Sequence, residues 1–254
     1  MGNLHDGHLS LIAGAREIAD RVVCSIFVNP MQFGPGEDLD GYPRTLESDE
    51  TALANHGGVD LLFLPEMRTI YPYGTDSAVS VALPPLSKDL CGASRPGHFD
   101  GVASVVLRLM NIVAPHVLVL GDKDFQQRIL LERMLEDLHV PASVVSAAIY
   151  REPDGLAMSS RNSYLSSDER VVAPGLYAIL NSVATALRDG DRDYGALEAD
   201  ASLQLAKRGF RPDYVSVRRA RDLAPSDVFE AGDECVVLAA AWLGKARLID
   251  NIRV

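Results

Sequence analysis

Two kinds of apolar pattern alternate along the first 150 residues of the chain. Short apolar runs rich in β-branched residues predict buried strands, and longer stretches with apolar residues three or four positions apart predict helices. The predicted strands are 22–28, 61–64 and 117–120, and the predicted helices are 9–19, 46–55, 102–113 and 125–138. Apolar strands that alternate with helices indicate a parallel sheet covered on both faces. The pattern therefore predicts an α/β fold with ligands in the loops beyond the carboxyl ends of the strands.

The pattern changes at residues 150–155, Tyr-Arg-Glu-Pro-Asp-Gly, which we interpret as a domain boundary. The stretches beyond it with helical spacing are 171–188 and 194–207, and those with strand character are 214–217, 235–239 and 247–249. This order predicts a smaller α+β domain after a larger α/β domain.

Composition and charge limit the classes of partner. The 254 residues are 47% hydrophobic and 23% charged, as in ordinary soluble globular proteins. The net charge of −11 repels polyanions, so we expect no nucleic-acid or membrane partner, whereas a few Lys or Arg side chains in a cleft can still hold a small anion.

Cysteine usage and hydropathy indicate a cytoplasmic protein. Cys24, Cys91 and Cys235 show neither metal-binding spacing nor a disulfide framework. We find no apolar run of about 18 residues that predicts a transmembrane helix. The first six residues have neither the basic nor the apolar segment of a signal peptide.

The first chemically informative segment is Met-Gly-Asn-Leu-His-Asp-Gly-His at residues 1–8, just before a predicted helix. Backbone N–H groups and the helix dipole favour an anion at a helix start. The imidazoles of His5 and His8 can donate hydrogen bonds to phosphate oxygens as charge develops on them, and Gly7 allows close approach of a nucleotide. A metal site is the alternative, but no carboxylate or cysteine cluster in the sequence clearly completes its shell.

Polar residues also follow a predicted strand at 27–33, Phe-Val-Asn-Pro-Met-Gln-Phe. The amides of Asn29 and Gln32 can recognise hydroxyl and carboxylate groups of a small ligand. In the segment 94–99, Ser-Arg-Pro-Gly-His-Phe, Arg95 is a candidate fork for a carboxylate or phosphate. An ordinary strand-to-loop transition and a solvated arginine are the alternatives.

Two later segments suit phosphate binding. Lys123, one of four lysines, lies at a predicted helix start, where it opposes the macrodipole, so a phosphate partner explains it better than stability does. The Ser-Ser-Arg run at 159–161 can bind phosphate oxygens and, near the domain boundary, could close over a nucleotide. A solvated Asp-Lys-Asp cap and a polar linker are the alternatives.

Taken together and in this order, the five segments resemble the pantothenate synthetase family, within the His-X-Gly-His nucleotidyltransferase superfamily. The likeness extends over most of the chain, and the long Phe-Val-Asn-Pro-Met-Gln-Phe run makes it specific. It also includes Tyr-Pro-Arg-Thr at 42–45, Ile-Tyr-Pro at 70–72, Ala-Ala-Trp-Leu-Gly at 240–244 and Ile-Asp-Asn at 249–251.

The resemblance implies a Rossmann-like parallel-sheet domain over 1–149 that binds ATP and pantoate, and a smaller α+β lid domain over 150–254. It implies a homodimer whose substrates are pantoate, β-alanine and ATP with Mg²⁺. A pantoate carboxylate oxygen would attack the α-phosphorus of ATP and release pyrophosphate, and the amine of β-alanine would then displace AMP. Because no protein nucleophile is needed, catalysis would rest on positioning and charge stabilisation.

The resemblance also implies roles for individual residues. His8 as proton donor, His5 and Lys123 are the implied catalytic residues, and Mg²⁺ would be held mostly by phosphates and water rather than by protein ligands. Gln32 and Gln127 are implied to bind pantoate, and Gln32 also β-alanine. The implied ATP-binding residues are Met1, Gly2, Asn3, Leu4, His5, Asp6, Gly7, His8, Gly121, Asp122, Lys123, Asp124, Tyr150, Met158, Ser159, Ser160 and Arg161.

One departure from the family concerns the start of the chain. Family members have a helix and a strand ahead of the histidine motif, ending in Pro-Thr just before Met-Gly, whereas this chain starts at that Met. Losing several buried side chains, at roughly 1.5–3 kcal/mol each, could use up most of a typical stability of about 5–15 kcal/mol. The hypothesis from the sequence is that the start is assigned too far downstream.

Three other functions stay open at this point. Another adenylyl- or cytidylyltransferase would share the histidine motif but should lack the Asn-Pro-Met-Gln-Phe segment. A class I aminoacyl-tRNA synthetase would need a tRNA partner, which the charge of −11 disfavours. A catalytically inert protein would bind nucleotide without pantoate-dependent turnover.

Overall fold

The computed structural model describes residues 2–34, 36–37, 39–230 and 232–254, and its internal contacts divide the chain into two units. The first unit comprises Met1–Asp122 and Leu130–Ala147, and the second comprises Lys123–Ile129 and Ala148–Val254. The boundary predicted between 149 and 150 assigned Lys123–Ile129 to the first domain instead. The lid role of the second domain stays a prediction.

The first unit begins with two helices around a short parallel strand pair. These elements are α1 (Asp6–Ile18), β1 (Val23–Ser25), α2 (Leu46–His56) and β2 (Leu61–Phe63). Ile12 of α1, Leu53 of α2 and Val22 are the buried members of a small apolar cluster. The apolar residues predicted from helical spacing therefore pack α1 and α2 together beside the strand pair.

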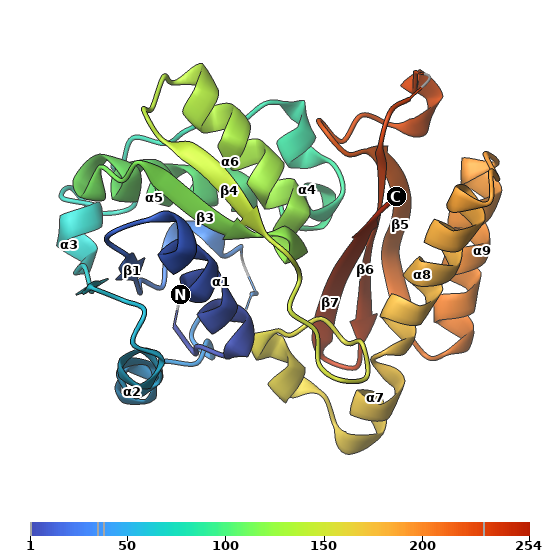
Figure 1. Ribbon diagram of the computed structural model, residues 1–254, viewed down its shortest axis with the longest axis horizontal. Helices are drawn as coiled ribbons and strands as arrows, with labels where there is room; N and C mark the ends of the chain where they lie inside the picture. Colours follow the sequence, from blue (N-terminus) through green and yellow to red (C-terminus); the bar gives the residue numbers. More distant parts are fainter. Residues whose placement is uncertain (1, 35, 38, 231) are drawn as a thin grey trace. The chain divides into compact units, whose positions relative to one another are not determined.

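A second parallel pair lies farther along the first unit, with two more helices (Figure 1). These elements are α5 (His98–Val113), β3 (Val117–Gly121), α6 (Phe125–Asp137), whose residues before Leu130 belong to the second unit, and β4 (Ser143–Ala147). Val102 and Met110 of α5 pack with Leu131 and Leu135 of α6, and Leu118 of β3 is half-buried against them. The sequence did not predict β4, because its serines interrupt the apolar run on which the strand prediction relied.

The predicted parallel sheet is therefore divided. β1 pairs with β2, and β3 pairs with β4, but the described residues form no ladder between the two pairs. The parallel direction is as predicted, and in the described part of the chain the parallel strands form two separate pairs. The predicted strand 22–28 is also shorter, because only Val23–Ser25 find ladder partners.

Short elements connect these parts of the first unit. They are η1 (Pro30–Gln32), a single 3₁₀ turn, α3 (Met67–Ile70), η2 (Pro85–Lys88), a second 3₁₀ turn, and α4 (Cys91–Ser94). Ile70, Tyr71 and Val105 form a small buried cluster, and the side chain of Met31 in η1 packs against it. The 3₁₀ turn η1 is thereby fixed on the apolar interior.

The second unit contains a three-stranded antiparallel sheet with order β5-β6-β7. Its strands are β5 (Arg211–Arg219), β6 (Cys235–Leu243) and β7 (Ala246–Arg253), and its main helices are α8 (Gly175–Arg188) and α9 (Tyr194–Lys207). The helices lie along the sheet (Figure 1), and Leu180 and Leu205 pack with Val217 and Val237 in one apolar core. The smaller α+β unit predicted beyond residue 150 has this architecture.

One stretch of the second unit, Ser167–Arg188, is long and apolar enough to span a membrane by length and composition alone. The structure divides it into α7 (Ser167–Val172) and α8, with Ala173 and Pro174 between them. Leu176, Leu180 and Leu187 of α8 are buried in the core formed with the sheet. The apolar character of this stretch is thus explained by packing within the unit.

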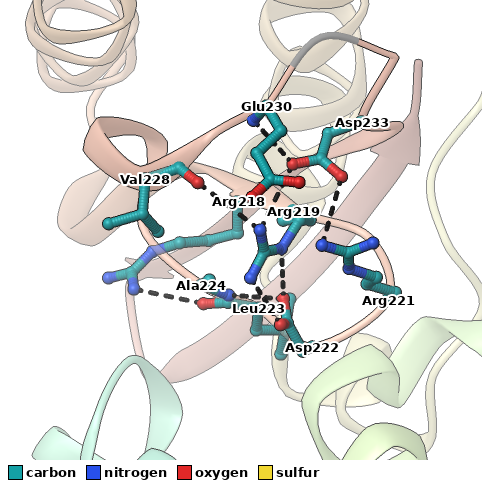
Figure 2. Close-up of polar contacts among 9 residues, drawn as sticks. All are labelled: Arg218, Arg219, Arg221, Asp222, Leu223, Ala224, Val228, Glu230 and Asp233. Carbon is teal, nitrogen blue, oxygen red and sulfur yellow. Dashed lines mark hydrogen bonds and ion pairs between the residues drawn. The ribbon is translucent and has the colours of Figure 1, made fainter.

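An ionic network holds the connection from β5 to β6, which includes the 3₁₀ turn η5 (Ser226–Val228). Figure 2 shows Arg219 at its centre, within 2.7 Å of Asp222 and 3.3 Å of Asp233. Asp233 also accepts a hydrogen bond from the N–H of Glu230 at 2.9 Å. The network thus holds the connection in place, together with the buried side chain of Leu223.

Candidate active site

The predicted histidine pair lies at the start of α1. His5 is the extended residue before the first turn, and its N–H donates to Nδ1 of His8 at 3.3 Å. The ring centroids are 4.0 Å apart. Because Nδ1 of His8 accepts this hydrogen bond, the proton of the neutral ring lies on Nε2. His8 therefore has the tautomer needed to donate from Nε2 to a phosphate oxygen.

The loop before the histidines is tied to α2 by a buried carboxylate. Asp49 is 2% exposed, and its two oxygens accept the N–H groups of Asn3 at 2.9 Å and of Leu4 at 2.7 Å. Asn3 has a positive φ of 53°, a conformation that non-glycine residues rarely adopt. At Gly2, a Cβ would lie 3.1 Å from an Asp49 oxygen. The loop is thus shaped around Asp49, a residue with no functional signal in the sequence pattern.

Gln32, predicted to bind both carboxylate substrates, is the last residue of η1. Its Oε1 accepts a hydrogen bond from Asn29 Nδ2 at 3.2 Å, which sets the direction of the amide. Asn29 is 1% exposed and also donates to the carbonyl of Gly101 in α5 at 3.1 Å. A Cβ on Gly101 would collide with the carbonyl of Met31. Close backbone contact between α5 and η1 therefore requires glycine here.

Tyr71 completes the support of Asn29. Its hydroxyl donates to Asn29 Oδ1 at 2.7 Å, and the guanidinium of Arg108 lies 4.8 Å from the centre of its ring. Burial raises the pKa of Tyr71, with the positive charge of Arg108 opposing the rise. The phenol therefore stays protonated at neutral pH and keeps its donor role.

Arg95, a predicted anion fork, already holds a carboxylate of the protein. Its Nε and Nη2 donate to Glu37 at 2.9 and 2.5 Å, a bidentate pair. Its Nη1 lies 2.8 Å from Nε2 of His98, the first residue of α5. The other ring nitrogen of His98 lies 2.7 Å from the carbonyl of Gln32. Arg95 thus belongs to a chain of contacts that ends at Gln32.

In the second unit, Lys123 lies in η3 (Asp122–Asp124), the 3₁₀ turn before α6. Its Nζ is 3.6 Å from a carboxylate oxygen of Asp124, and its side chain is 23% exposed. Its carbonyl accepts a hydrogen bond from Asn251 Nδ2 of β7 at 3.2 Å. The predicted phosphate-binding lysine is therefore tied through its backbone to the antiparallel sheet.

The predicted phosphate loop of the second unit is anchored at its first residue and through the segment before it. Ser159 caps the 3₁₀ turn η4 (Ser160–Tyr164), with its Oγ accepting the N–H of Arg161 at 3.3 Å. Before the loop, Arg151 forms a bidentate pair with buried Asp250 of β7 at 2.7 and 2.9 Å. The same β7 pair, Asp250 and Asn251, thus supports both the loop and the Lys123 turn.

Comparisons with known proteins decide the family. A model of the family described as "Pantoate-beta-alanine ligase" matches residues 1–253. The chain belongs to the pantoate–β-alanine ligase family. Its activity is accordingly the ligation of pantoate and β-alanine to pantothenate, as the resemblance implied.

Individual relatives of the pantoate–β-alanine ligase family agree with this result. The pantothenate synthetase of Stutzerimonas stutzeri is 52% identical over 254 residues, which cover 100% of this chain and 88% of the relative. That of Thioalkalivibrio sulfidiphilus is 54% identical over 255 residues, with the same two shares.

Solved structures of the family confirm the predicted fold class. The pantothenate synthetase of Thermus thermophilus matches with a TM-score of 0.91 at 43% identity, over 99% of this chain and 90% of that one. The pantoate–β-alanine ligase of Francisella tularensis, a complex with "Beta-gamma ATP and Beta-alanine", matches with a TM-score of 0.80 at 34% identity. It is covered over 86% of its length, and this chain over 99%.

The residues implied by the family resemblance fall in both units. Gly2–His8, Gln32, Gly121 and Asp122 belong to the first unit, and Met1 lies outside the described residues. Lys123, Asp124, Gln127, Tyr150 and Met158–Arg161 belong to the second. The structure brings His5 to His8 and Lys123 to Asp124 within each unit. All the implied substrate roles stay predictions.

Among the described residues, two thiols have a shifted pKa. Burial raises the pKa of the Cys24 and Cys235 thiols, which are free of disulfides. In the part of the chain that the structure describes, no three His, Cys, Asp or Glu side chains are grouped to hold a metal ion.

Proposed function

We propose that this ligase activates pantoate with ATP before it joins the pantoyl group to β-alanine. In the first step, a pantoate carboxylate oxygen forms a bond to the α-phosphorus of ATP, and the bond to the leaving pyrophosphate breaks. In the second, the amine of β-alanine attacks the acyl carbon of pantoyl adenylate, loses a proton and displaces AMP. The solved complex of the Francisella tularensis relative with "Beta-gamma ATP and Beta-alanine" supports ATP and β-alanine as ligands.

The observation that carries the proposal is the histidine pair at the start of α1. The N–H of His5 fixes the tautomer of His8, so that Nε2 of His8 bears the proton. A positioned donor at a helix N-terminus stabilises the charge that develops on phosphate oxygens. His8 is therefore the proposed proton donor, and His5 its partner against the phosphates.

Other residues of the first unit are proposed to hold the acyl substrates. Gln32 has its amide oriented by Asn29, which suits it to recognise the hydroxyl or carboxylate groups of pantoate and of β-alanine. The backbone of Gly2–His8, together with Gly121 and Asp122, is proposed to contact ATP. The N–H groups of Asn3 and Leu4 already bind Asp49, so they support the loop rather than a phosphate.

In the second unit, Lys123 and Arg161 supply the positive charge proposed for ATP phosphates. The two hydroxyls of Ser159 and Ser160 add donors beside Arg161. Asp124, Tyr150 and Met158 are proposed to contact the nucleotide, and Gln127 is proposed to bind pantoate. Positioning and charge stabilisation suffice for this reaction, because ATP supplies the leaving group.

Three further features rest on the family resemblance. Mg²⁺ is proposed to enter as part of the ATP substrate, held by phosphate oxygens and water, the ligands that Mg²⁺ commonly keeps. The chain is proposed to form a homodimer. It is proposed to act in the cytoplasm, where no nucleic-acid or membrane partner is expected.

The test is pantoate-dependent exchange of pyrophosphate into ATP, measured with Mg²⁺ and without β-alanine. We expect exchange that requires pantoate and falls about 100-fold or more in His8→Ala, the range for general acid–base and electrostatic groups. Nucleotide binding without exchange in the wild-type chain would contradict the proposal. Exchange that persists in His8→Ala would instead remove His8 from its role.

A further inference from the structure

We propose that His98 is a positioning residue that fixes Gln32 for the acyl substrate through a relay of contacts from Glu37 and Arg95. The inference rests on the proposed substrate role of Gln32. In this proposal His98 does not touch the substrate. It acts by holding the main-chain carbonyl of Gln32.

The chemistry of Arg95 determines which nitrogen of His98 carries the proton. A guanidinium has only donors, so Nε2 of His98, 2.8 Å from Arg95 Nη1, must accept. The proton of the neutral ring is then on Nδ1, which lies 2.7 Å from the carbonyl oxygen of Gln32 and donates to it. The direction of both contacts follows from the inability of arginine to accept a hydrogen bond.

Glu37 fixes the other end of the relay. Its carboxylate takes the Nε and Nη2 donors of Arg95, and the two side chains are 22% and 18% exposed. Burial raises the pKa of Glu37, but the hydrogen bond and positive charge of Arg95 outweigh it, so the pKa of Glu37 is lowered. The ionised carboxylate holds the guanidinium with its remaining donor toward His98.

The relay matters because Gln32 lies in a single short turn. Asn29 holds its side-chain amide, and Gly101 of α5 allows η1 to approach the helix backbone. His98, 9% exposed at the start of the same helix, holds its carbonyl. With side chain and main chain both fixed, the amide of Gln32 keeps one direction, which a specific contact to a small substrate requires.

Two substitutions separate the two halves of the relay. In His98→Asn, the side-chain N–H₂ can occupy the place of Nδ1 and still donate to Gln32, while the contact with Arg95 is lost. In His98→Gln, the longer amide reaches the place of Nε2 and can accept from Arg95, while the donor to Gln32 is lost. Both variants are neutral amides, so charge does not differ between them.

We expect His98→Gln to raise the KM for pantoate about tenfold, the effect of one buried hydrogen bond. The KM for ATP should change less than about twofold, and His98→Asn should return the KM for pantoate to within about threefold of wild type. The measurement is initial-rate kinetics of pantothenate formation with each substrate varied in turn.

A matched control distinguishes positioning from a general loosening of α5. Asp100, also in the first turn of α5, accepts the N–H of Leu83 at 3.0 Å and thus ties the helix to a different segment. Asp100→Asn should lower the melting temperature as His98→Gln does, with the KM for pantoate unchanged. An equal rise of that KM in Asp100→Asn, or an equal defect in His98→Asn and His98→Gln, would overturn the proposal.

A second readout does not depend on activity. In protein labelled with ¹⁵N-histidine, the ring signals of His98, assigned by their loss in His98→Asn, should show a proton on Nδ1. In Arg95→Met they should shift toward a mixture of the two tautomers. If the wild-type protein carries the proton of His98 on Nε2, the relay is refuted even if the proposed function holds. If the proton is on Nδ1 but pantoate-dependent exchange of pyrophosphate into ATP is absent, only the proposed function is refuted.

Discussion

The two units of the molecule use different means to hold their residues in place. In the second unit, β6 is buried along most of its length, and one continuous apolar cluster joins the sheet to α8 and α9. In the described part of the first unit, every residue of β3 is only half-buried, and many of the buried apolar residues lie in clusters smaller than that of the second unit. Apolar burial therefore defines the second unit more completely than the first.

The first unit compensates with buried polar side chains that each hold one chemically important segment. Asp49 holds the loop before the histidines, and Asn29 and His98 hold Gln32. The hydrogen bonds of these side chains orient the segments but add little to the free energy of unfolding. Each bond mainly offsets the free-energy cost of removing the polar group from water. We therefore expect substitutions in the core of the second unit to change mainly the free energy of unfolding. Substitutions at the buried polar side chains of the first unit should change mainly the kinetic constants.

The largest expected effect is on the core of the second unit. Leu180→Ala removes a side chain that is 0% exposed in the large cluster, and we expect a loss of about 3–5 kcal/mol in the free energy of unfolding. Leu53→Ala, at a residue 5% exposed in a small cluster of the first unit, should lose about 2–3 kcal/mol. Urea unfolding followed by circular dichroism measures both.

Because two units can unfold in separate steps, each transition is fitted separately. An equal or larger loss for Leu53→Ala would contradict the comparison, since it would mean that the half-buried strands conceal a core as well packed as that of the second unit.

The sequence predicted the fold best where periodicity was long and uninterrupted. The predicted helix 194–207 coincides with α9, and 125–138 with α6 to within one residue. Strands were predicted less well, because Ser143 and Ser146 mask β4, and because pairing between strands is a long-range property that local pattern does not contain. Pro174 likewise divides the predicted helix 171–188 into α7 and α8.

The second expected effect is kinetic and concerns Asp49. In Asp49→Asn, one oxygen is replaced by an N–H₂ group that faces the N–H of Asn3 or Leu4, and a buried charge-assisted hydrogen bond is lost. Such a bond is worth about 1.5–3 kcal/mol, so we expect the KM for ATP to rise about tenfold or more with little change in the KM for β-alanine. Initial-rate kinetics measures both constants.

Asp60→Asn is the control for this prediction. Asp60 also accepts a loop N–H, that of Val22 at 2.8 Å, but at a segment with no predicted substrate role. It should lower stability and leave the KM for ATP unchanged. If both variants raised the KM for ATP equally, Asp49 would be an ordinary structural anchor.

The candidate site was predictable where the residue type itself carries chemistry. The histidine pair, Gln32 and Lys123 were proposed from their side chains and their places beside predicted elements, and their substrate roles stay predictions. Asp49, distant in sequence from the loop that it holds, gave no local signal, because a lone Asp in the first turn of a helix has an ordinary explanation as a favourable charge. Arg95 was identified as a fork, but its partner Glu37 could not be found without the fold.

The smallest expected effect tests the ionic network of the second unit, which holds the connection from β5 to β6 (Figure 2). The hydrogen bond from Arg219 lowers the pKa of Asp222, and the N–H of Glu230, together with Arg219 and Arg221, lowers the pKa of Asp233. A carboxyl whose folded pKa is lowered stabilises the fold above its unfolded pKa of about 3.9, and that stability is lost as pH falls through the folded value.

Arg219→Gln should therefore lower the melting temperature slightly at pH 7, and the difference from wild type should shrink as the pH falls below about 4. Arg221→Gln should have a smaller effect, because its side chain is 62% exposed and lies 3.5 Å from Asp233, where solvent screens the pair. Thermal unfolding between pH 7 and pH 3 measures both differences. The difference in melting temperature between Arg219→Gln and wild type could instead stay constant across this range. Arg219 would then act through its hydrogen bond to the carbonyl of Val228 rather than through the carboxylates, and neutral contacts would hold the connection.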